Sequence, residues 1–260
     1  KVRGGTHALL RLNDKQRSRG VVTASSGNHG LGIARAAHRL SIPATVFVPN
    51  HASQSKVQAI QQLGINVERV GDDCVETEEY ARVMATGKGQ TYISPYNDQT
   101  IIEGQGTIGV ELMEQLPQLD AVFVSIGGGG LISGVGAYLK AVKPSIEIIG
   151  CSPAASPAMH ACMEAGKIID VPCRETFSDA TAGGVEQGSI TFDLCRQFVD
   201  QSIVIGEADI ALAVRDVIGT QHMLVEGAAG VAVAGYRQVA DRYKNKTVAI
   251  ILCGANIGLD

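Results

Sequence analysis

The sequence predicts an α/β protein made of two parallel-sheet, three-layer domains. Apolar runs of strand length alternate with amphipathic helical patterns along most of the 260 residues. Three loops rich in glycine or small polar residues each follow a predicted strand, where ligands bind in open α/β sheets. Repeated strand–helix–strand units of this kind require parallel strands with helices on both faces of each sheet.

The first series of elements covers residues 20–97 and predicts the smaller α/β domain. Its expected strands are 20–24, 44–49, 65–70 and 91–95. The helices between them end near residue 40, span 53–64 with Gly64 as a stop signal, and span 74–86.

The pattern restarts after "PYND" (95–98) and predicts a larger α/β domain made of residues 1–19 plus 98–260. Its expected strands are 120–126, 146–150, 202–206 and 247–253. Its expected helices are 101–116, a stretch ending near residue 140, 157–165, 189–198, 207–220 and 226–243.

Composition excludes several classes of protein. A net charge of −4 without a run of Lys or Arg argues against nucleic-acid binding. No apolar stretch approaches the 18 residues of a membrane span. The six cysteines form no CxxC pair, which favours reduced thiols in a cytoplasmic protein. We therefore expect a small-molecule ligand, with no nucleic-acid or membrane partner.

Four consecutive glycines, Gly127, Gly128, Gly129 and Gly130, separate a predicted strand from a predicted helix. They offer no side chains, so they let the backbone approach a ligand and aim N–H groups at an anion. Neither the acidic residue of a dinucleotide-binding fingerprint nor a GxxxxGK[ST] motif accompanies them. The loop predicts a phosphate site, and the alternative is a tight turn without a ligand.

The stretch "SSGNHG" (25–30) places short polar side chains at another strand-to-helix junction. Such a junction suits anion binding by backbone N–H groups and small hydroxyls. The alternative is a helix cap with satisfied polar side chains, although one such residue would be enough for capping.

Four motifs together resemble the threonine/serine dehydratase and serine racemase family of pyridoxal-phosphate enzymes. They are "SSGNHG" (25–30), "GQGTIGVE" (104–111), "IGGGGL" (126–131) and "LCGAN" (252–256), in the family's order and spacing. The resemblance covers essentially the whole chain and implies the tryptophan synthase β-subunit-like fold. It also implies that the N-terminal segment of the family is missing, so we expect the intact enzyme to be longer.

The resemblance implies that the cofactor is pyridoxal 5′-phosphate and that Lys1, in "KVRGG", is the lysine that forms a Schiff base with it. By itself, a lysine at this position reads as a solvated surface charge. Lys1 would also act as acid and base at the substrate α-carbon. The other cofactor-binding residues that the resemblance implies are Asn28 at the ring hydroxyl, Gly127–Gly130 and Leu131 at the phosphate, and Glu226 and Cys253 near the ring.

The resemblance also implies a substrate-binding group made of Ser25, Ser26, His29 and Tyr96. Ser25, Ser26 and His29 would surround the substrate carboxylate. Tyr96 lies where dehydratases tend to have Phe, which favours elimination. Ser26 favours racemisation, because racemases use a serine there to protonate the opposite face of the substrate; it is the second candidate catalytic residue.

Two departures from the family pattern concern the region 152–190. Ser152 and Ala158 stand where the racemases carry acidic ligands for a divalent cation, so we predict no metal at that position. Gly183 and Gly184 replace the family's usual "ADG", which leaves the substrate side-chain pocket undefined.

The leading hypothesis is a pyridoxal-phosphate ammonia-lyase that converts a small β-hydroxy amino acid, such as threonine or serine, to a 2-keto acid and ammonia. Cys253 supports it, because a thiol is a weak partner for the pyridine nitrogen and favours prompt loss of a leaving group. The alternatives are a serine-type racemase and a non-catalytic phospholigand-binding or regulatory domain. A homodimer is expected from the apolar helices of a two-domain fold.

Overall fold

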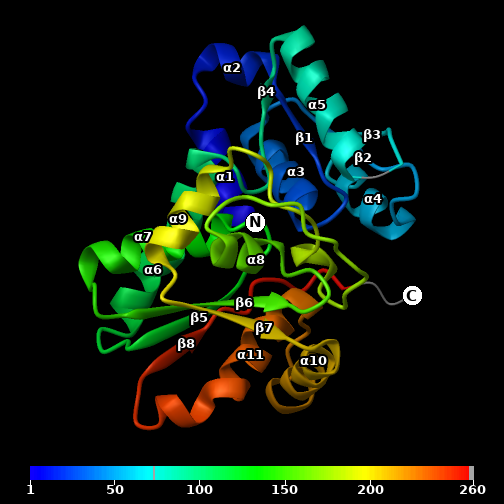
Figure 1. The fold of residues 1–260 in the computed structure, drawn as a ribbon. Coiled ribbons are helices and arrows are strands. Elements are labelled where there is room, and N and C mark those ends of the chain that lie inside the picture. The colour runs from blue at the N-terminus through cyan, green and yellow to red at the C-terminus, as the bar shows by residue number, and fades with distance from the viewer. Residues whose placement is uncertain (73, 258–260) are drawn as a thin grey trace. The chain divides into compact units, whose positions relative to one another are not determined.

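The computed structural model describes residues 1–72 and 74–257 (Figure 1). The chain divides into two compact units, Lys1–Gly104 and the part from Gln105 onward. Helix α6 (Gln99–Gln115) contains the boundary between them. Each unit has its own four-stranded sheet in which every pair of neighbouring strands is parallel. The predicted α/β class with two parallel sheets is confirmed.

The sheet of the first unit has the strand order β3-β2-β1-β4. Val21 of β1 lies opposite Ala44 of β2 and opposite Thr91 of β4. The strands are β1 (Val21–Ala24), β2 (Ala44–Val48), β3 (Asn66–Arg69) and β4 (Thr91–Tyr92). The helices that lie wholly in this unit are α1 (Val2–Leu10), α2 (Asp14–Arg19), α3 (Asn28–Leu40), α4 (Gln54–Gln61) and α5 (Cys74–Lys88).

Helices cover both faces of this sheet, and alternate residues of the central strands β1 and β2 point into the two layers. Helices α1, α3 and α4 cover one face, in a core that includes Leu9, Ile33, Ile60, Val21 and Val46. Helix α5 covers the other face, in a core that includes Ala81, Ala85, Val22, Ala24 and Phe47. The first unit therefore has three layers.

The sheet of the second unit has the order β7-β6-β5-β8 and is also covered on both faces. Its strands are β5 (Ala121–Ser125), β6 (Glu147–Pro153), β7 (Gln201–Ile205) and β8 (Val248–Ile250). Helices α10 (Glu207–Gln221) and α11 (Gly227–Val239) pack on the face of Phe123 and Ile149. Helices α7 (Gly130–Val142), α8 (Ala158–Ala165) and α9 (Ile190–Phe198) pack on the face of Val122 and Val124. Two short 3-10 helices, η1 (Asp179–Thr181) and η2 (Ala240–Tyr243), complete the unit.

Residues 1–19 differ most from the sequence-based expectation. They form α1 and α2, which the apolar pattern did not predict, and they lie in the first unit and not with the larger one. The physical reason is packing, because Ala8 and Leu9 of α1 join the core that contains Ile33 of α3. A sequence signal for α2 exists: Asn13 accepts a hydrogen bond from the Gln16 N–H, and the Gln16 side chain accepts one from the Asn13 N–H.

Strands β4 and β8 are shorter than predicted, since the chain leaves each sheet early to form a loop. In β4 the ladder ends because the carbonyl of Ile93 accepts hydrogen bonds from the side chains of Thr23 and His29. Among the described residues, no helix is both long and apolar enough to cross a membrane.

Candidate active site

Lys1 immediately precedes helix α1, and its side chain reaches the segment that follows β4. Its Nζ donates a hydrogen bond to the carbonyl of Pro95 over 2.7 Å. Lys1 is exposed, and as the N-cap residue it makes no side-chain capping bond to α1. The position of Nζ therefore depends on where α1 is held and on the loop that carries Pro95.

Helix α1 is held against the first turns of α6 by an unusually close approach of the two backbones. A Cβ on Gly104 would lie 2.6 Å from Gly4 Cα, 2.8 Å from His7 Cβ and 2.9 Å from the Arg3 carbonyl oxygen. Real Cβ atoms essentially never come within 3.0 Å of such atoms. Only glycine at position 104 permits this placement of α1.

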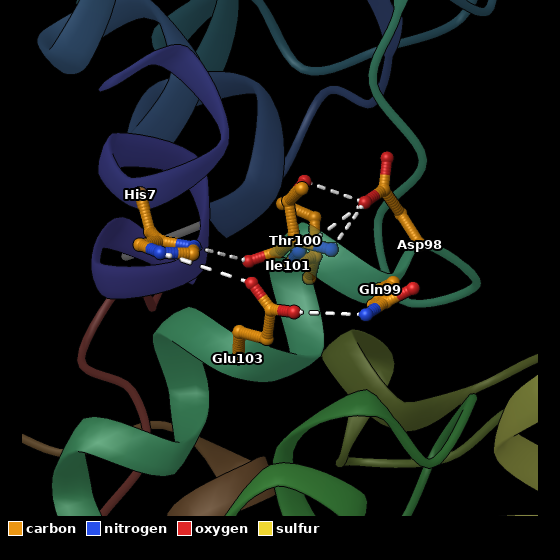
Figure 2. A network of polar contacts seen from close by, with 6 residues as sticks. All are labelled: His7, Asp98, Gln99, Thr100, Ile101 and Glu103. Atoms are coloured by element: carbon orange, nitrogen blue, oxygen red, sulfur yellow. Dashed lines mark hydrogen bonds and ion pairs between the residues drawn. The ribbon is translucent and has the colours of Figure 1, made fainter. Parts of the chain in front are cut away.

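A polar network joins the same two helices, as Figure 2 shows. His7 Nδ1 donates to the Thr100 carbonyl over 2.8 Å, and His7 Nε2 lies 3.9 Å from Glu103 Oε2. Asp98 Oδ1 accepts hydrogen bonds from Thr100 N (2.7 Å), Thr100 Oγ1 (2.6 Å) and Ile101 N (3.3 Å). Asp98 thus caps the start of α6, and His7 fixes α1 to that capped turn.

The "SSGNHG" junction follows β1 and opens α3, as the sequence predicts. Ser25, Ser26, Gly27 and Asn28 are partly exposed, whereas His29 is buried. Gly27 is the N-cap residue and makes no side-chain capping bond, while Ser25 Oγ accepts from the Gly27 N–H over 3.2 Å. The N–H groups of the first turn of α3 have no acceptor within the helix. This arrangement favours an anion site over side-chain capping.

His29 has one ring nitrogen engaged and one without a partner. Nε2 lies 3.2 Å from the carbonyl of Ile93, so it must be the donor, and Nδ1 is then an acceptor. Nδ1 is buried and has no hydrogen-bond partner among the described residues. Burial first, and the charge of Lys1 second, lower the pKa of His29 to about 3, against a raising effect of the Ile93 bond. A neutral ring in this state offers a carboxylate no N–H from Nδ1, so Nδ1 cannot act as a donor to it.

The pKa of His29 predicts a pH dependence of stability. The unfolded state takes up a proton near pH 6.5 and the folded state only near pH 3, so the unfolded state binds more protons between these values. We expect the free energy of unfolding to fall as the pH drops from 7 toward 4, by at most about 1.4 kcal/mol per pH unit from this residue. Urea unfolding of wild type and His29→Gln between pH 4.5 and 7 measures the difference. Parallel pH profiles would contradict the prediction.

The loop that follows β4 lies beside both Lys1 and His29 within the first unit. The Ile93 carbonyl accepts from Thr23 Oγ1 (2.8 Å) and from His29, and the Pro95 carbonyl accepts from Lys1. The predicted substrate residue Tyr96 comes directly after Pro95 and is partly buried. Within the first unit, Lys1 and the SSGNHG junction are therefore each hydrogen-bonded to the loop that carries Tyr96.

In the second unit, the glycine loop follows β5 and opens α7, as predicted. Gly129 has a φ of +85°, and a Cβ there would lie 2.9 Å from Cys195 Sγ. The Gly128 carbonyl accepts from Thr191 Oγ1 over 2.6 Å, and the Gly129 carbonyl accepts from Ser133 N over 2.9 Å. The N–H groups of Gly130 and Leu131 belong to the first turn of α7 and have no acceptor within that helix. Close backbone approach and N–H groups at a helix start fit the phosphate of the expected cofactor.

Glu226 and Cys253 lie together in the second unit. Glu226 is the N-cap residue of α11 and is 2% exposed. Its Oε2 accepts from Asn256 N over 2.8 Å, and its own N–H donates to the Gly254 carbonyl. Desolvation, and next the charge of Glu226, raise the pKa of the Cys253 thiol to about 11. The thiol is therefore protonated at neutral pH and offers a weak S–H donor, which fits the expected place beside a pyridine nitrogen.

The two positions at which we predict no metal carry a hydroxyl and a methyl side chain. Ser152 is the next-to-last residue of β6 and Ala158 is the first residue of α8, and both are buried. Among residues 1–72 and 74–257, no group of three or more His, Cys, Asp or Glu side chains could hold a metal ion. The absence of a metal stays a prediction. Gly183 is tied to this region, because its N–H donates to Ser156 Oγ over 3.0 Å.

Several residues of the site were missed by sequence reasoning. Thr23 and Ile93 lie inside predicted strands, and nothing in the period-2 pattern distinguishes them from packing residues. Gly104 was noted only as part of a family motif. Thr191 lies in a predicted helix more than sixty residues from the glycine loop that it contacts, so no local signal could have identified it.

Comparison with known proteins gives consistent matches along the chain. A sequence model of the family described as "Pyridoxal-phosphate dependent enzyme" matches residues 1–254. The L-threonine ammonia-lyase of Thermotoga maritima is 37% identical over 260 residues, which are 100% of this chain and 64% of that protein. The chain thus spans less than two thirds of the length of this relative.

Two solved structures are similar over the chain. The processed form of threonine deaminase isoform 2 from Solanum lycopersicum has a TM-score of 0.94 and 33% identity, covering 99% of this chain and 76% of that one. Maize serine racemase has a TM-score of 0.93 and 33% identity, covering 100% of this chain and 80% of that one.

Proposed function

Because this chain belongs to the pyridoxal-phosphate dependent enzyme family, we propose that the protein of which it is part is an ammonia-lyase for a small β-hydroxy amino acid. The substrate is threonine or serine, and the products are a 2-keto acid and ammonia. In the net reaction the substrate loses its α-proton and β-hydroxyl as water, and hydrolysis returns one water to release ammonia. The observation that carries the proposal is the 37% identity, over the whole chain, with an L-threonine ammonia-lyase.

When bound, pyridoxal phosphate supplies an electron sink that makes the α-proton of an amino acid acidic. Lys1 would hold the cofactor through Nζ and then take the α-proton. The N–H groups of Gly127–Gly130 and Leu131 would bind the phosphate, and Asn28 would bind the ring hydroxyl. The family motifs support these assignments, and the close backbone packing and helix start at the glycine loop support the phosphate site.

The substrate carboxylate would be bound at the start of α3. Ser25 and Ser26 offer partly exposed hydroxyls there, and the turn offers backbone N–H groups. His29 would fix this turn to the loop that carries Tyr96, through Ile93. Tyr96 would then border the substrate side chain.

Cys253 and Glu226 favour elimination. A thiol with a pKa near 11 stays neutral and donates only weakly, so it does not place a full proton on the pyridine nitrogen. The buried Glu226 carboxylate, held by the Asn256 N–H, supplies negative charge nearby. Weak withdrawal of electrons favours a substrate with a leaving group that departs promptly.

The test uses the intact protein with pyridoxal phosphate. Excess L-threonine, L-serine and a 3-hydroxyaspartate are supplied in turn, and 2-keto acid and ammonia are measured. We expect equal amounts of both products from at least one substrate. If none of the three yields a keto acid, the proposal is wrong.

A racemase is the second candidate, favoured by Ser26 in the SSGNHG junction and by the likeness to maize serine racemase. It requires a second group that protonates the opposite face of the substrate, and Ser26 would supply it. In that case Ser26→Ala abolishes the formation of the opposite enantiomer while keto-acid formation continues. The check is chiral chromatography of serine incubated in deuterated water. Absence of any inverted, deuterium-labelled enantiomer with the wild-type protein would exclude this candidate.

The cellular location, the substrate class and the oligomeric state of the protein are also proposals. The six cysteines all lie among the described residues and form no disulfide bond with one another, which supports a reducing, cytoplasmic environment. An amino-acid substrate is consistent with the relatives named above. A homodimer remains a prediction of the sequence.

A further inference from the structure

Helix α9 contacts the glycine loop through a chain of two hydroxyl groups, one on Thr191 of the helix and one on its N-cap residue Ser189. Thr191 Oγ1 lies 2.6 Å from the Gly128 carbonyl oxygen, and Ser189 Oγ lies 2.7 Å from Thr191 Oγ1. A carbonyl can only accept, so the single proton of Thr191 points to Gly128 and Ser189 must donate to Thr191. Thr191 is 0% and Ser189 2% exposed, so water does not compete for these bonds.

This contact sets the orientation of one peptide group of the loop. The C=O of Gly128 and the N–H of Gly129 belong to the same planar trans peptide and point in opposite directions. Because Thr191 holds the carbonyl on the side of α9, the N–H of Gly129 points away from α9. Gly129 has a φ of +85°, a backbone conformation that residues with a side chain rarely adopt, and this conformation permits the orientation.

The loop also rests directly on α9. A Cβ on Gly129 would lie 2.9 Å from Cys195 Sγ and 3.1 Å from Thr191 Cβ. Cys195 in turn lies 3.7 Å from Ser133 Oγ of α7. Residues of α9 thus both pack against the peptide between Gly128 and Gly129 and bond its carbonyl. The N–H of the same peptide, which points away from α9, is the group presented to a ligand.

We propose that Thr191, supported by Ser189, is a positioning residue for the phosphate of the cofactor. This inference rests on the proposed role of the glycine loop. Without the hydroxyl, the Gly128 carbonyl loses its partner and is free to rotate toward the ligand side. A carbonyl oxygen facing a phosphate replaces a donor by an acceptor, so phosphate binding weakens while contacts with the rest of the cofactor stay the same.

The experiment compares pyridoxal phosphate with pyridoxal, which lacks the phosphate. Dissociation constants of both are measured by absorption titration of the intact apoprotein, with Thr191→Val and with Thr191→Ser. Valine keeps the branched Cβ that packs under Gly129 and removes the hydroxyl, whereas serine keeps the hydroxyl. Thr220→Val is the matched control, since Thr220 Oγ1 also donates to a carbonyl, that of Asp216 within α10.

We expect Thr191→Val to bind pyridoxal phosphate about tenfold more weakly and pyridoxal with unchanged affinity. Thr191→Ser and Thr220→Val bind pyridoxal phosphate with nearly the wild-type affinity. Ser189→Ala loses affinity for pyridoxal phosphate, but less than Thr191→Val does. An unchanged affinity of Thr191→Val for pyridoxal phosphate overturns the inference. An equal loss for both ligands also overturns it, because that result indicates a merely structural role. If the wild type itself binds neither ligand, the proposed function fails first and this inference falls with it.

Discussion

Replacing Lys1 with alanine is expected to abolish keto-acid formation and the covalent attachment of pyridoxal phosphate. The ε-amino group would serve both as the point of attachment and as the base for the α-proton, so its removal takes away both functions at once. General acid–base catalysis alone accounts for about 10²–10⁴ in rate, so the loss exceeds that range when attachment is lost as well.

The fold should survive this substitution. The Lys1 side chain is exposed, does not cap α1, and donates a hydrogen bond to the Pro95 carbonyl in a loop. The measurement is borohydride reduction of the holoprotein, followed by peptide mapping, alongside the keto-acid assay. Lys15→Ala is the control, because Lys15 is an exposed lysine of the same unit.

Two outcomes would contradict the assignment. If borohydride still fixes the cofactor on another lysine of Lys1→Ala and activity persists, Lys1 is not the working residue. If the wild type binds the cofactor without any covalent linkage, a non-catalytic ligand-binding domain becomes the better description.

Replacing Gly104 with alanine is expected to destabilise the first unit and to lower activity. The added Cβ would meet Gly4 Cα at 2.6 Å and the Arg3 carbonyl oxygen at 2.9 Å. These are backbone atoms that cannot move aside as a flexible side chain does, so α1 must shift. Overpacking of this kind costs about 1–3 kcal/mol, which outweighs the helix preference of alanine over glycine.

The shift of α1 carries Lys1 with it. Displacement of a reacting group by about 1 Å can cost about 10²-fold in rate. We therefore expect kcat to fall under conditions in which the variant is still folded. Urea unfolding and steady-state kinetics of the holoenzyme measure the two effects separately.

Gly87→Ala gives a control with the opposite sign. Gly87 lies in α5 of the same unit, and nothing lies within 4 Å of a Cβ built there. That substitution should raise the free energy of unfolding by about 0.5–1 kcal/mol and leave kcat unchanged. If Gly104→Ala behaves like Gly87→Ala, the close approach of α1 and α6 does not hold Lys1 in place.

Much of the fold follows from local chemistry. The strands that begin at Val21, Ala44 and Ala121 are apolar on both faces, because each lies between two helical layers. Such runs identify parallel strands without any knowledge of their partners. Strand order is different: the placement of β4 beside β1, and of β8 beside β5, depends on contacts between distant segments.

The candidate site also has a part that local sequence predicts and a part that depends on contacts between distant segments. The ligand-facing loops could be predicted from local sequence alone, because a glycine run or a group of small polar residues after a strand places backbone N–H groups at a helix start. Local sequence did not determine what holds those loops. His29 is predicted to lie near the substrate carboxylate, and that stays a prediction. Only the structure shows that its Nε2 donates a hydrogen bond to the Ile93 carbonyl.

The contacts that hold the site in place could be identified only from the folded structure. These contacts join residues far apart in sequence: the hydrogen bond from Thr191 to Gly128, the close packing of Gly104 on Gly4, and the hydrogen bond from His7 to Thr100. Their residue types are common, and each is informative only once packing has brought its partner within a few ångströms. Ligand-facing loops are determined by local backbone needs, which leave a mark in the sequence. Supporting contacts are determined by long-range packing, which leaves none.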